Sequence, residues 1–443
     1  MAGRIRSREI SPLELVDAHL RQIDSMNPKI NAFVSVLAEE ARAAAANPVP
    51  GPLSGIPVTI KDSFDVAGLP TLSGSRLRRG HVAARDAGAV ARLRAAGAII
   101  VGKTNCPELL ANYESDNHII GRTNNPWDPE RTAGGSSGGE AAAIASFCSA
   151  GGIGSDGGGS IRLPAHFCGI CGLKPTPGRV SGAGHFPAMT HPGGLLGVAG
   201  PMARTARDLR LLFEVLAGYD PDDPFSAPVP LRQPEVSGVR IGVMEQFYQV
   251  PVQAAMCAAV QKAAGVLSGL GYPVEPFKPL GLERAPNLWS FFFTELAAVS
   301  TRGFFAGREA EVHWTGMEFF EPFRDAPAPE AKTILDNLAA RDSMRAALLG
   351  QMQHFPVVLA PVCAVPAFRH RERRWETDVK PVGLFQAMMP LTWVNLLGLP
   401  AVTLPISRSE EGLPVGIQLI GRPYEEELLL ELAVRMEAVQ ASM

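Results

Sequence analysis

The stretch from Gly134 to Thr176 contains two glycine clusters that each carry serine, GGSSGG and DGGGS. Glycine loses more backbone freedom on folding than any other residue, so such clusters favour tight turns and a close approach of the backbone to a ligand. A serine hydroxyl in such a turn lies beside free backbone N–H groups, and this combination suits a nucleophile with an oxyanion hole. The stretch therefore predicts acyl-transfer chemistry, with a flexible Gly/Ser linker as the alternative.

A candidate base lies upstream, in the β-rich run IPVTIKD at 56–62, which ends in Lys61 and Asp62. A lysine acts as a base only when it is neutral, and burial in an apolar strand lowers its pKa toward that state. The alternative is an ordinary lysine whose ammonium group extends to the surface. Lys61 is therefore a candidate proton acceptor for the serines.

The elements that must position these residues follow an alternating helix and strand pattern. Residues 1–45 are predicted as two helices, the first opened by a capping box at Ser11–Glu14 and the second running from about 28 to 46. The further predicted elements are a helix over 86–97, a strand over 98–104, helices over 106–113 and 205–218, a strand over 239–244, a helix over 252–270, helices to about 352, and a tail of strands with helices near 382–397 and 424–440. This alternation predicts an α/β sheet.

Three short motifs fit known patterns without the context that those patterns need. Residues 97–104 match the phosphate-binding GxxxxGK[ST] pattern, but their middle residues form a predicted strand instead of a loop. Residues 152–157 match GxGxxG, but no βαβ unit surrounds them. Cys168 and Cys171 form a CxxC without a second pair for zinc, so we interpret them as buried thiols.

A fourth motif, GxSxG, occurs around Ser136 and again around Ser137 and is typical of the α/β-hydrolase nucleophile elbow. That elbow needs a strand directly before it, whereas a polar loop with proline precedes Ser136 here. It also needs a downstream histidine, and none of the candidates has a distinctive context. Those candidates are His185, His191, His313, His354 and His370. The α/β-hydrolase remains an alternative.

Over nearly its whole length, the chain resembles the amidase signature family. The resemblance rests on GIPVTIKDSFDVAG, GGSSGG, SDGGGSIRLPAHFCGICGLKPTPGRVS, GPMARTARDLRLLFEVLAG, NLLGLPAVTLPIS and GLPVGIQLIGRPYEE, besides SPLELVDAHLRQID near the start. It implies one α/β/α domain over 1–443, built on a large twisted mixed β-sheet flanked by helices, with no metal and no cofactor. Within that domain we expect N-terminal helices (1–45), a catalytic core (46–215), a variable region around the substrate pocket (216–345) and a C-terminal completion of the sheet (346–443).

The resemblance also implies a role for each residue of a Ser–cisSer–Lys triad. Ser160 corresponds to the nucleophile, Ser136 to a bridging serine in a cis peptide after Gly135, and Lys61 to the base. The oxyanion hole corresponds to the backbone N–H groups of Gly157, Gly158, Gly159 and Ser160. The mechanism implied is amide hydrolysis through an acyl-enzyme on Ser160.

Other residues are expected to support this loop. Asp156 and Arg162 bracket it and could pair to fix its shape, with a surface ion pair as the alternative. Ser137 and Thr132 are expected to contribute hydrogen bonds. Gly157 departs from the family pattern, which has a larger residue at this position, and a third glycine adds freedom to the oxyanion loop.

The substrate is expected to be apolar or aryl. Leu110 and Ala111 fall where fatty-acid-amide members of the family place substrate-channel residues, and aromatic residues concentrate at 285–325, with core packing as the alternative interpretation. Amides, aryl carbamates (urethanes) and esters are the expected small-molecule substrates. The rival functions are the A component of a transamidosome, which supplies ammonia for aminoacyl-tRNA amidation, and a silent binding protein.

Composition restricts the partners and the compartment. The chain has 443 residues with a net charge of −3, which favours neither nucleic acid nor an anionic membrane as a partner. Six scattered cysteines predict a reducing cytoplasm instead of a disulfide scaffold. No secretory signal and no membrane-spanning run is recognisable. The two N-terminal helices could mediate a homodimer.

Overall fold

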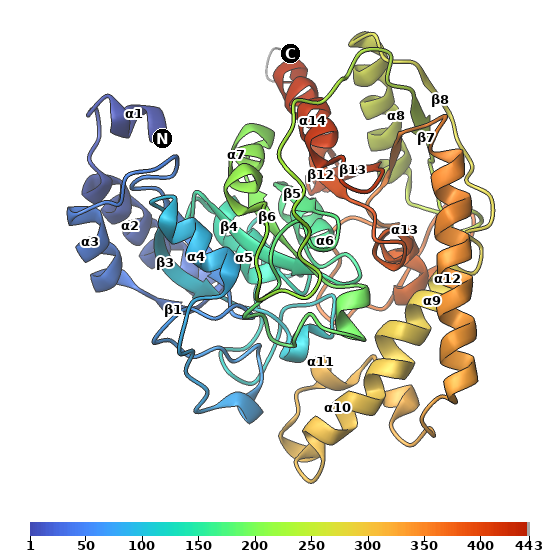
Figure 1. Ribbon diagram of the computed structural model, residues 1–443, viewed down its shortest axis with the longest axis horizontal. Helices are drawn as coiled ribbons and strands as arrows, with labels where there is room; N and C mark the ends of the chain where they lie inside the picture. Colours follow the sequence, from blue (N-terminus) through green and yellow to red (C-terminus); the bar gives the residue numbers. More distant parts are fainter. Residues whose placement is uncertain (441–443) are drawn as a thin grey trace.

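The chain builds a mixed sheet of 11 strands in the computed structural model, which describes residues 1–440 (Figure 1). In spatial order the strands are β1 (Phe33–Val36), β3 (Ile99–Thr104), β2 (Pro57–Lys61), β4 (Gly151–Asp156), β6 (Val198–Ala203), β5 (Cys171–Lys174), β12 (Ala401–Arg408), β13 (Pro414–Gly421), β9 (Val357–Pro361), β7 (Ile241–Val243) and β8 (Val274–Pro276). A separate pair joins β10 (Arg374–Trp375) to β11 (Val382–Gly383). The predicted single α/β domain with a large mixed sheet is confirmed.

Strand direction brings the candidate base to the glycine loop. β2 runs parallel to both β3 and β4, with Ile60 opposite Ile153. The carboxyl ends of parallel neighbours lie at the same edge of a sheet, so Lys61 at the end of β2 and Asp156 at the end of β4 emerge together. β6, β5, β12, β13 and β9 continue in antiparallel order from β4.

The helices flank this sheet and extend below it in Figure 1. They are α1 (Ala2–Arg6), α2 (Pro12–Ile30), α3 (Ala38–Ala46), α4 (Gly88–Ala95), α5 (Gly138–Ala145), α6 (Arg162–Cys168), α7 (Ala206–Leu216), α8 (Ala254–Gly269), α9 (Ala285–Ser290), α10 (Ala297–Phe305), α11 (Trp314–Met317), α12 (Ala331–Gln351), α13 (Leu384–Leu396) and α14 (Glu426–Gln440). A π-helical segment, η4 (Phe291–Leu296), joins α9 to α10. The short 3₁₀ segments are η1 (Arg76–Arg78), η2 (Glu108–Leu110), η3 (Gly193–Leu195), η5 (Glu309–Glu311) and η6 (Glu321–Phe323).

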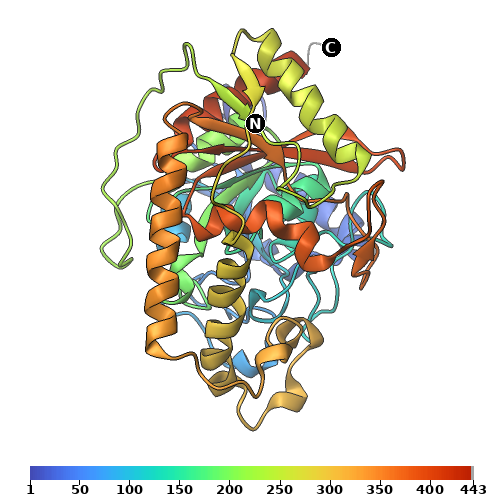
Figure 2. The ribbon, with the colours of Figure 1, turned by 90° about the vertical axis from the view of Figure 1, so that its right-hand side faces the viewer.

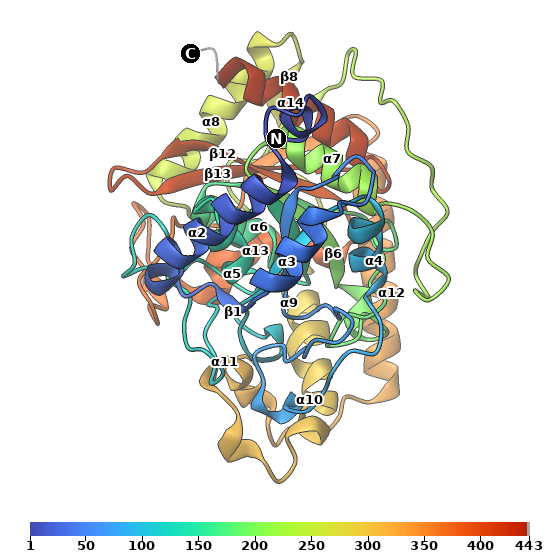
Figure 3. The ribbon, with the colours of Figure 1, turned by 90° about the vertical axis from the view of Figure 1, so that its left-hand side faces the viewer.

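Both faces of the sheet are covered. Along β3, Ile100 packs into the hydrophobic cluster that contains α4, α7, α8 and α14, whereas its neighbours Ile99 and Val101 pack into the cluster of α2, α3, α5 and α6. Side chains alternate between the faces of a strand, so the two clusters lie on opposite faces. Figure 3 shows α2 and α3 in front of one end of the sheet. A third cluster unites α9, α12 and α13, and α12 stands along the side of the molecule in Figure 2.

Several predicted elements are confirmed with small shifts of their ends. The capping box of α2 is present, since Glu14 N–H donates to Ser11 Oγ at 3.1 Å and Ser11 N–H donates to Glu14 Oε2 at 2.8 Å. The predicted helices 86–97, 205–218, 252–270, 382–397 and 424–440 correspond to α4, α7, α8, α13 and α14. The residues of the two glycine-rich nucleotide motifs lie mainly in strands β3 and β4. Cys168 and Cys171 are buried free thiols.

Two predicted helices are wrong. The region expected to form one helix from 28 to 46 instead contains the end of α2, strand β1 and helix α3. Asn31 adopts a left-handed conformation (φ 48°) directly after α2. The side-chain oxygen Oδ1 of Asn27 accepts hydrogen bonds from the N–H groups of Ala32 and Phe33. These side-chain contacts end the helix and turn the chain into β1.

The helix expected over 106–113 is only the 3₁₀ segment η2, with Leu109 and Leu110 at φ 50° and 62°. Tertiary contacts override the helical pattern here. The Glu108 carboxylate is buried and accepts Ser75 Oγ–H at 2.6 Å and the His313 N–H. These contacts tie the segment to distant parts of the chain. Within residues 1–440, no helix is long and apolar enough to cross a membrane.

Candidate active site

Lys61 lies fully buried at the end of β2 and faces the serine loops. Its Nζ donates to Ser136 Oγ at 2.7 Å and to Ser137 Oγ and Ser155 Oγ at 3.0 Å each. Burial lowers the pKa of Lys61 to about 8. The amine therefore has a substantial neutral fraction just above neutral pH, as a general base requires.

Ser136 begins the turn into α5, and the peptide bond between Gly135 and Ser136 is cis, as the resemblance implies. A side chain on Gly135 would lie 2.5 Å from the carbonyl oxygen of Asn112, so only glycine fits there. Ser136 Oγ is hydrogen-bonded to Lys61, not to a histidine. Within residues 1–440, no strand directly precedes Ser136, so the nucleophile elbow of an α/β-hydrolase is not formed.

Ser160 lies in the turn between β4 and α6 and is 7% exposed. Together with Ser136, Ser155 and Gly157, it lines a cavity of about 380 Å³. Its carbonyl oxygen accepts the Ser137 N–H at 3.1 Å, which joins the two serine-bearing turns. Ser136 and Ser160 thus line the same cavity, with Lys61 behind Ser136.

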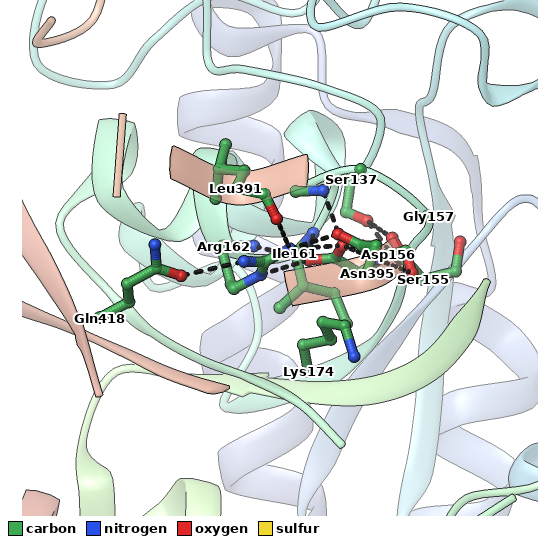
Figure 4. Close-up of polar contacts among 12 residues, drawn as sticks. Ser137, Ser155, Asp156, Gly157, Ile161, Arg162, Lys174, Leu391, Asn395 and Gln418 are labelled. Carbon is green, nitrogen blue, oxygen red and sulfur yellow. Dashed lines mark hydrogen bonds and ion pairs between the residues drawn. The ribbon is translucent and has the colours of Figure 1, made fainter. Parts of the chain in front are cut away.

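Asp156 and Arg162 form an ion pair with both side chains fully buried, so the surface ion pair considered as an alternative is excluded (Figure 4). Arg162 Nε lies 3.1 Å from Asp156 Oδ2. Burial alone would raise the pKa of the Asp156 carboxyl, but the adjacent guanidinium outweighs it and holds this pKa well below its usual range. The same carboxylate accepts the N–H groups of Gly159 at 2.7 Å and Ile161 at 3.1 Å.

The Gly159 N–H therefore points at Asp156, which distinguishes it from the other expected oxyanion donors. The backbone carbonyl groups of Gly157 and Gly158 also accept hydrogen bonds from side chains. Gly157 O accepts Trp289 Nε1–H at 2.9 Å, and Gly158 O accepts Tyr113 Oη–H at 3.0 Å. In a trans peptide the N–H points away from the C=O, so the contact with Trp289 turns the N–H of Gly158 to the opposite side.

The cavity wall is mainly apolar. Leu110 and Ala111 line it, as do Phe292, Phe293 and Phe304 from the aromatic-rich region predicted at 285–325. Phe186 and the loop that follows it complete the wall. The lining residues in the described chain include no Arg, Lys or Glu, and Arg162 neutralises the charge of Asp156; burial lowers the pKa of His185 to about 3 and keeps that ring neutral.

Sequence reasoning missed several residues that complete the site. Ser155 is a third hydroxyl partner of Lys61, although it lies in the SDGGGS run that drew attention to Ser160. Tyr113 and Trp289 hold the glycine loop, and only the local excess of aromatic residues hinted at Trp289. Asn395 and Gln418 bind Arg162 from the C-terminal region; both lie in runs that resemble the family, but nothing in those runs links them to Arg162. The expected support from Thr132 is present, since its Oγ1 accepts the Gly134 N–H at 3.0 Å.

No group of three or more His, Cys, Asp or Glu side chains within residues 1–440 is arranged to hold a metal ion. The chemistry available from the residues present is proton transfer between hydroxyls and a buried amine, beside backbone N–H groups of a glycine loop. This set suits nucleophilic attack on a carbonyl carbon.

Comparisons with known proteins agree with this chemistry. The Amidase family profile matches residues 14–430. An indoleacetamide hydrolase of Bradyrhizobium diazoefficiens is 33% identical, with 98% of this chain and 85% of the relative covered. The A component of the glutamyl-tRNA(Gln) amidotransferase of Roseiflexus castenholzii is 36% identical, with 96% of this chain and 91% of the relative covered.

Solved structures are similar in the same way. A 6-aminohexanoate cyclic dimer hydrolase in complex with substrate superposes with a TM-score of 0.88 at 29% identity, covering 99% of this chain and 95% of the other. A bacterial aryl acylamidase of the amidase signature family superposes with a TM-score of 0.87 at 27% identity, covering 99% and 94%. Because the family profile matches residues 14–430, the chain belongs to the amidase family.

Proposed function

We propose that this enzyme hydrolyses the amide bond of a small, uncharged, apolar or aryl substrate through an acyl-enzyme on Ser160. The observation that carries the proposal is the 2.7 Å contact between Lys61 Nζ and Ser136 Oγ beside Ser160 in one apolar cavity. By the same chemistry, aryl carbamates and esters are substrates. We expect this enzyme in the cytoplasm. We also propose that the N-terminal helices within residues 1–45 form the contact of a homodimer.

In the first half-reaction, Ser160 Oγ attacks the carbonyl carbon. Its proton passes to Ser136 Oγ, and Ser136 gives its own proton to neutral Lys61 Nζ. The oxyanion lies against the N–H groups of Gly157, Gly158 and Ser160, since Gly159 N–H is directed at Asp156. The C–N bond then breaks, and the leaving nitrogen receives the proton from Lys61 through Ser136.

In the second half-reaction, water attacks the acyl carbon of the ester on Ser160. The water proton travels through Ser136 to Lys61, and Ser160 Oγ recovers a proton by the reverse path when the acid leaves. The supporting hydroxyls of Ser137 and Ser155 keep the Lys61 amine directed at the relay, because each lies 3.0 Å from Nζ.

The substrate class follows from the charges of the wall. A substrate carboxylate or ammonium would enter a cavity whose charged lining residue, Asp156, is already paired. Burying an unpaired charge costs several kcal/mol, about 3 or more. We therefore propose a neutral substrate whose apolar part lies against Leu110, Ala111 and the phenylalanines.

A second candidate function, that of an amidotransferase component, is favoured by the 36% identity to such a protein. Its substrate glutamine carries an ammonium and a carboxylate, whereas the described wall has no Arg or Lys for the carboxylate and its Asp156 is already paired with Arg162. Release of ammonia from glutamine at a rate above that from neutral aryl and aliphatic amides would favour this candidate over the amidase.

The nucleophile is tested with a fluorophosphonate probe and peptide mass mapping. We expect the label on Ser160 in the wild type, no label and no turnover in Ser160→Ala, and slow labelling still on Ser160 in Ser136→Ala. Ser149→Ala is the matched control, because Ser149 Oγ donates to Gly151 O outside the cavity, and it should be labelled normally. A label on Ser136, or undiminished turnover in Ser160→Ala, would overturn the assignment.

A further inference from the structure

Gly157 and Phe293 share one small volume beside the candidate oxyanion loop. A Cβ atom placed on Gly157 would lie 3.3 Å from Phe293 Cε2 and 3.9 Å from Phe293 Cδ2. The first distance is closer than an ordinary van der Waals contact between carbons. The phenyl ring thus occupies the space into which a side chain at position 157 would extend.

Phe293 reaches this place from a π-helical segment. η4 (Phe291–Leu296) interrupts the helix between α9 and α10, and its Thr294 Oγ1 donates at 2.5 Å to the carbonyl oxygen of Ser290, the last residue of α9. A π-helical turn carries an extra residue and changes the direction of the side chains that follow, and such turns occur often at functional sites. Here the segment places both Phe292 and Phe293 on the cavity wall.

The ring is held against the loop by its neighbour. Phe293 stacks on Trp289 with ring centroids 4.5 Å apart and an angle of 15° between the planes. Trp289 in turn donates its Nε1–H to Gly157 O at 2.9 Å. The phenyl ring is therefore positioned relative to the same peptide group that carries an expected oxyanion donor, and the ring is only half-buried because its other side faces the cavity.

We infer that Phe293 is a specificity-determining residue that limits the size of the group attached to the reacting carbonyl. The inference rests on the proposed function, because the oxyanion loop defines where that carbonyl lies. A substituent next to the carbonyl carbon must pass the face of the Phe293 ring. Gly157 makes this arrangement possible, since any larger residue there would displace the ring.

The test measures kcat/KM on two substrate series. One series varies the acyl group of p-nitroanilides from acetyl through butyryl to phenylacetyl, and the other varies the N-substituent of acetamides over the same range of sizes. In Phe293→Ala, the ratio of kcat/KM for the largest against the smallest member should rise about tenfold or more in either the acyl series or the N-substituent series. A rise of this size is expected when the truncated side chain opens space for several methylene groups. The other series should keep its wild-type ratio.

Coupling between the two residues gives a second measurement. Gly157→Ala should lower kcat/KM about tenfold by pressing on the ring. In the double variant Gly157→Ala/Phe293→Leu, most of this loss should disappear, because contacting residues are not additive. Phe304→Leu is the matched control: Phe304 lines the same cavity but is not among the nearest neighbours of a side chain at 157, so it should not rescue Gly157→Ala.

Failure of the inference is distinct from failure of the proposed function. If the wild type hydrolyses members of either series but Phe293→Ala changes every member by the same factor, Phe293 does not determine size. Additive effects of Gly157→Ala and Phe293→Leu on kcat/KM would overturn the inference as well. If the folded wild type hydrolyses no amide, carbamate or ester, the proposed function itself is wrong.

Discussion

A lysine without exposed surface is a costly residue, and its neighbours determine what it can do. Within residues 1–440, the side-chain hydrogen bonds of Lys61 go to three hydroxyls and to no carboxylate. Hydroxyls can accept from the ammonium or donate to the neutral amine, so they tolerate both protonation states. A directly bonded carboxylate would favour the ammonium instead. This environment suits a proton acceptor better than a structural cation.

The pH profile of kcat/KM tests this role. Because the pKa of Lys61 is lowered to about 8 by burial, and because the neutral form is the base, activity should rise with pH and level off above about 8. Below that value the amine is protonated, and kcat/KM should fall about tenfold for each pH unit. The measurement is kcat/KM on a neutral anilide from pH 6 to 10.

Lys61→Met is the accompanying variant, since methionine preserves much of the apolar volume. Loss of the base should lower kcat by about 10² to 10⁴-fold, while the thermal midpoint should change little, because the buried amine is removed together with its three hydrogen bonds. A wild-type profile that is flat from pH 6 to 10, or a Lys61→Met variant with normal turnover, would show that Lys61 is not the base.

The residues that the sequence could predict are those inside continuous motifs. Ser136, Ser160 and Lys61 lie in runs whose types and spacing already indicate chemistry, and the structure brings all three to one place. Asn395 and Gln418 also lie in runs that resemble the family, but their role could not be predicted, because it exists only once distant segments meet around Arg162. The Gly159 N–H could not be distinguished from its neighbours either, since its direction depends on the conformation of the loop.

At the scale of elements, the helix α9 acts on the glycine loop through one indole. Trp289 donates to Gly157 O at 2.9 Å, and this contact fixes the peptide plane that includes the Gly158 N–H. Trp289→Phe removes the donor and retains a ring that can stack on Phe293. We expect kcat to fall about 5- to 100-fold with little change of KM, because a held carbonyl is left without its partner.

Trp127→Phe is the matched control for this prediction. Trp127 Nε1–H also donates to a backbone carbonyl at 2.9 Å, that of Cys168, but it lies away from the lining residues of the cavity. Its kcat should stay within about twofold of the wild type, since no candidate oxyanion donor depends on it. Equal losses of kcat in both variants would mean that the Trp289 effect is structural.

The boundaries of the helices show where tertiary contacts override the local sequence pattern. α2 and α7 begin where predicted, because capping residues and periodic apolar positions agree there. Segment 106–113 fails as a helix because buried Glu108 binds groups more than 30 residues away. The π-helical η4 could not be predicted, since its sequence differs from that of an α-helix by no recognisable signal.

At the scale of the whole molecule, Arg162 connects the two halves of the sheet (Figure 4). It pairs with Asp156 at the end of β4, donates to Asn395 Oδ1 and Leu391 O in α13, and donates to Gln418 Oε1 in β13. A buried guanidinium needs all of these acceptors to offset its lost hydration. The pair therefore joins the glycine loop after β4 to the C-terminal part of the fold.

Asp156→Asn should consequently destabilise the entire domain. Removing one partner of a buried ion pair leaves an uncompensated charge, so we expect the free energy of unfolding to fall by about 3–5 kcal/mol in urea titrations. Asp336→Asn is the control, because its pair with Lys332 on α12 is exposed and contributes less than about 1 kcal/mol. Because the pKa of Asp156 is lowered in the folded state, its carboxylate stabilises the fold at neutral pH. The difference in the free energy of unfolding between the wild type and Asp156→Asn should therefore decrease only when acid protonates Asp156. Equal free energies of unfolding of Asp156→Asn and Asp336→Asn would contradict the stabilising role of the Asp156–Arg162 pair.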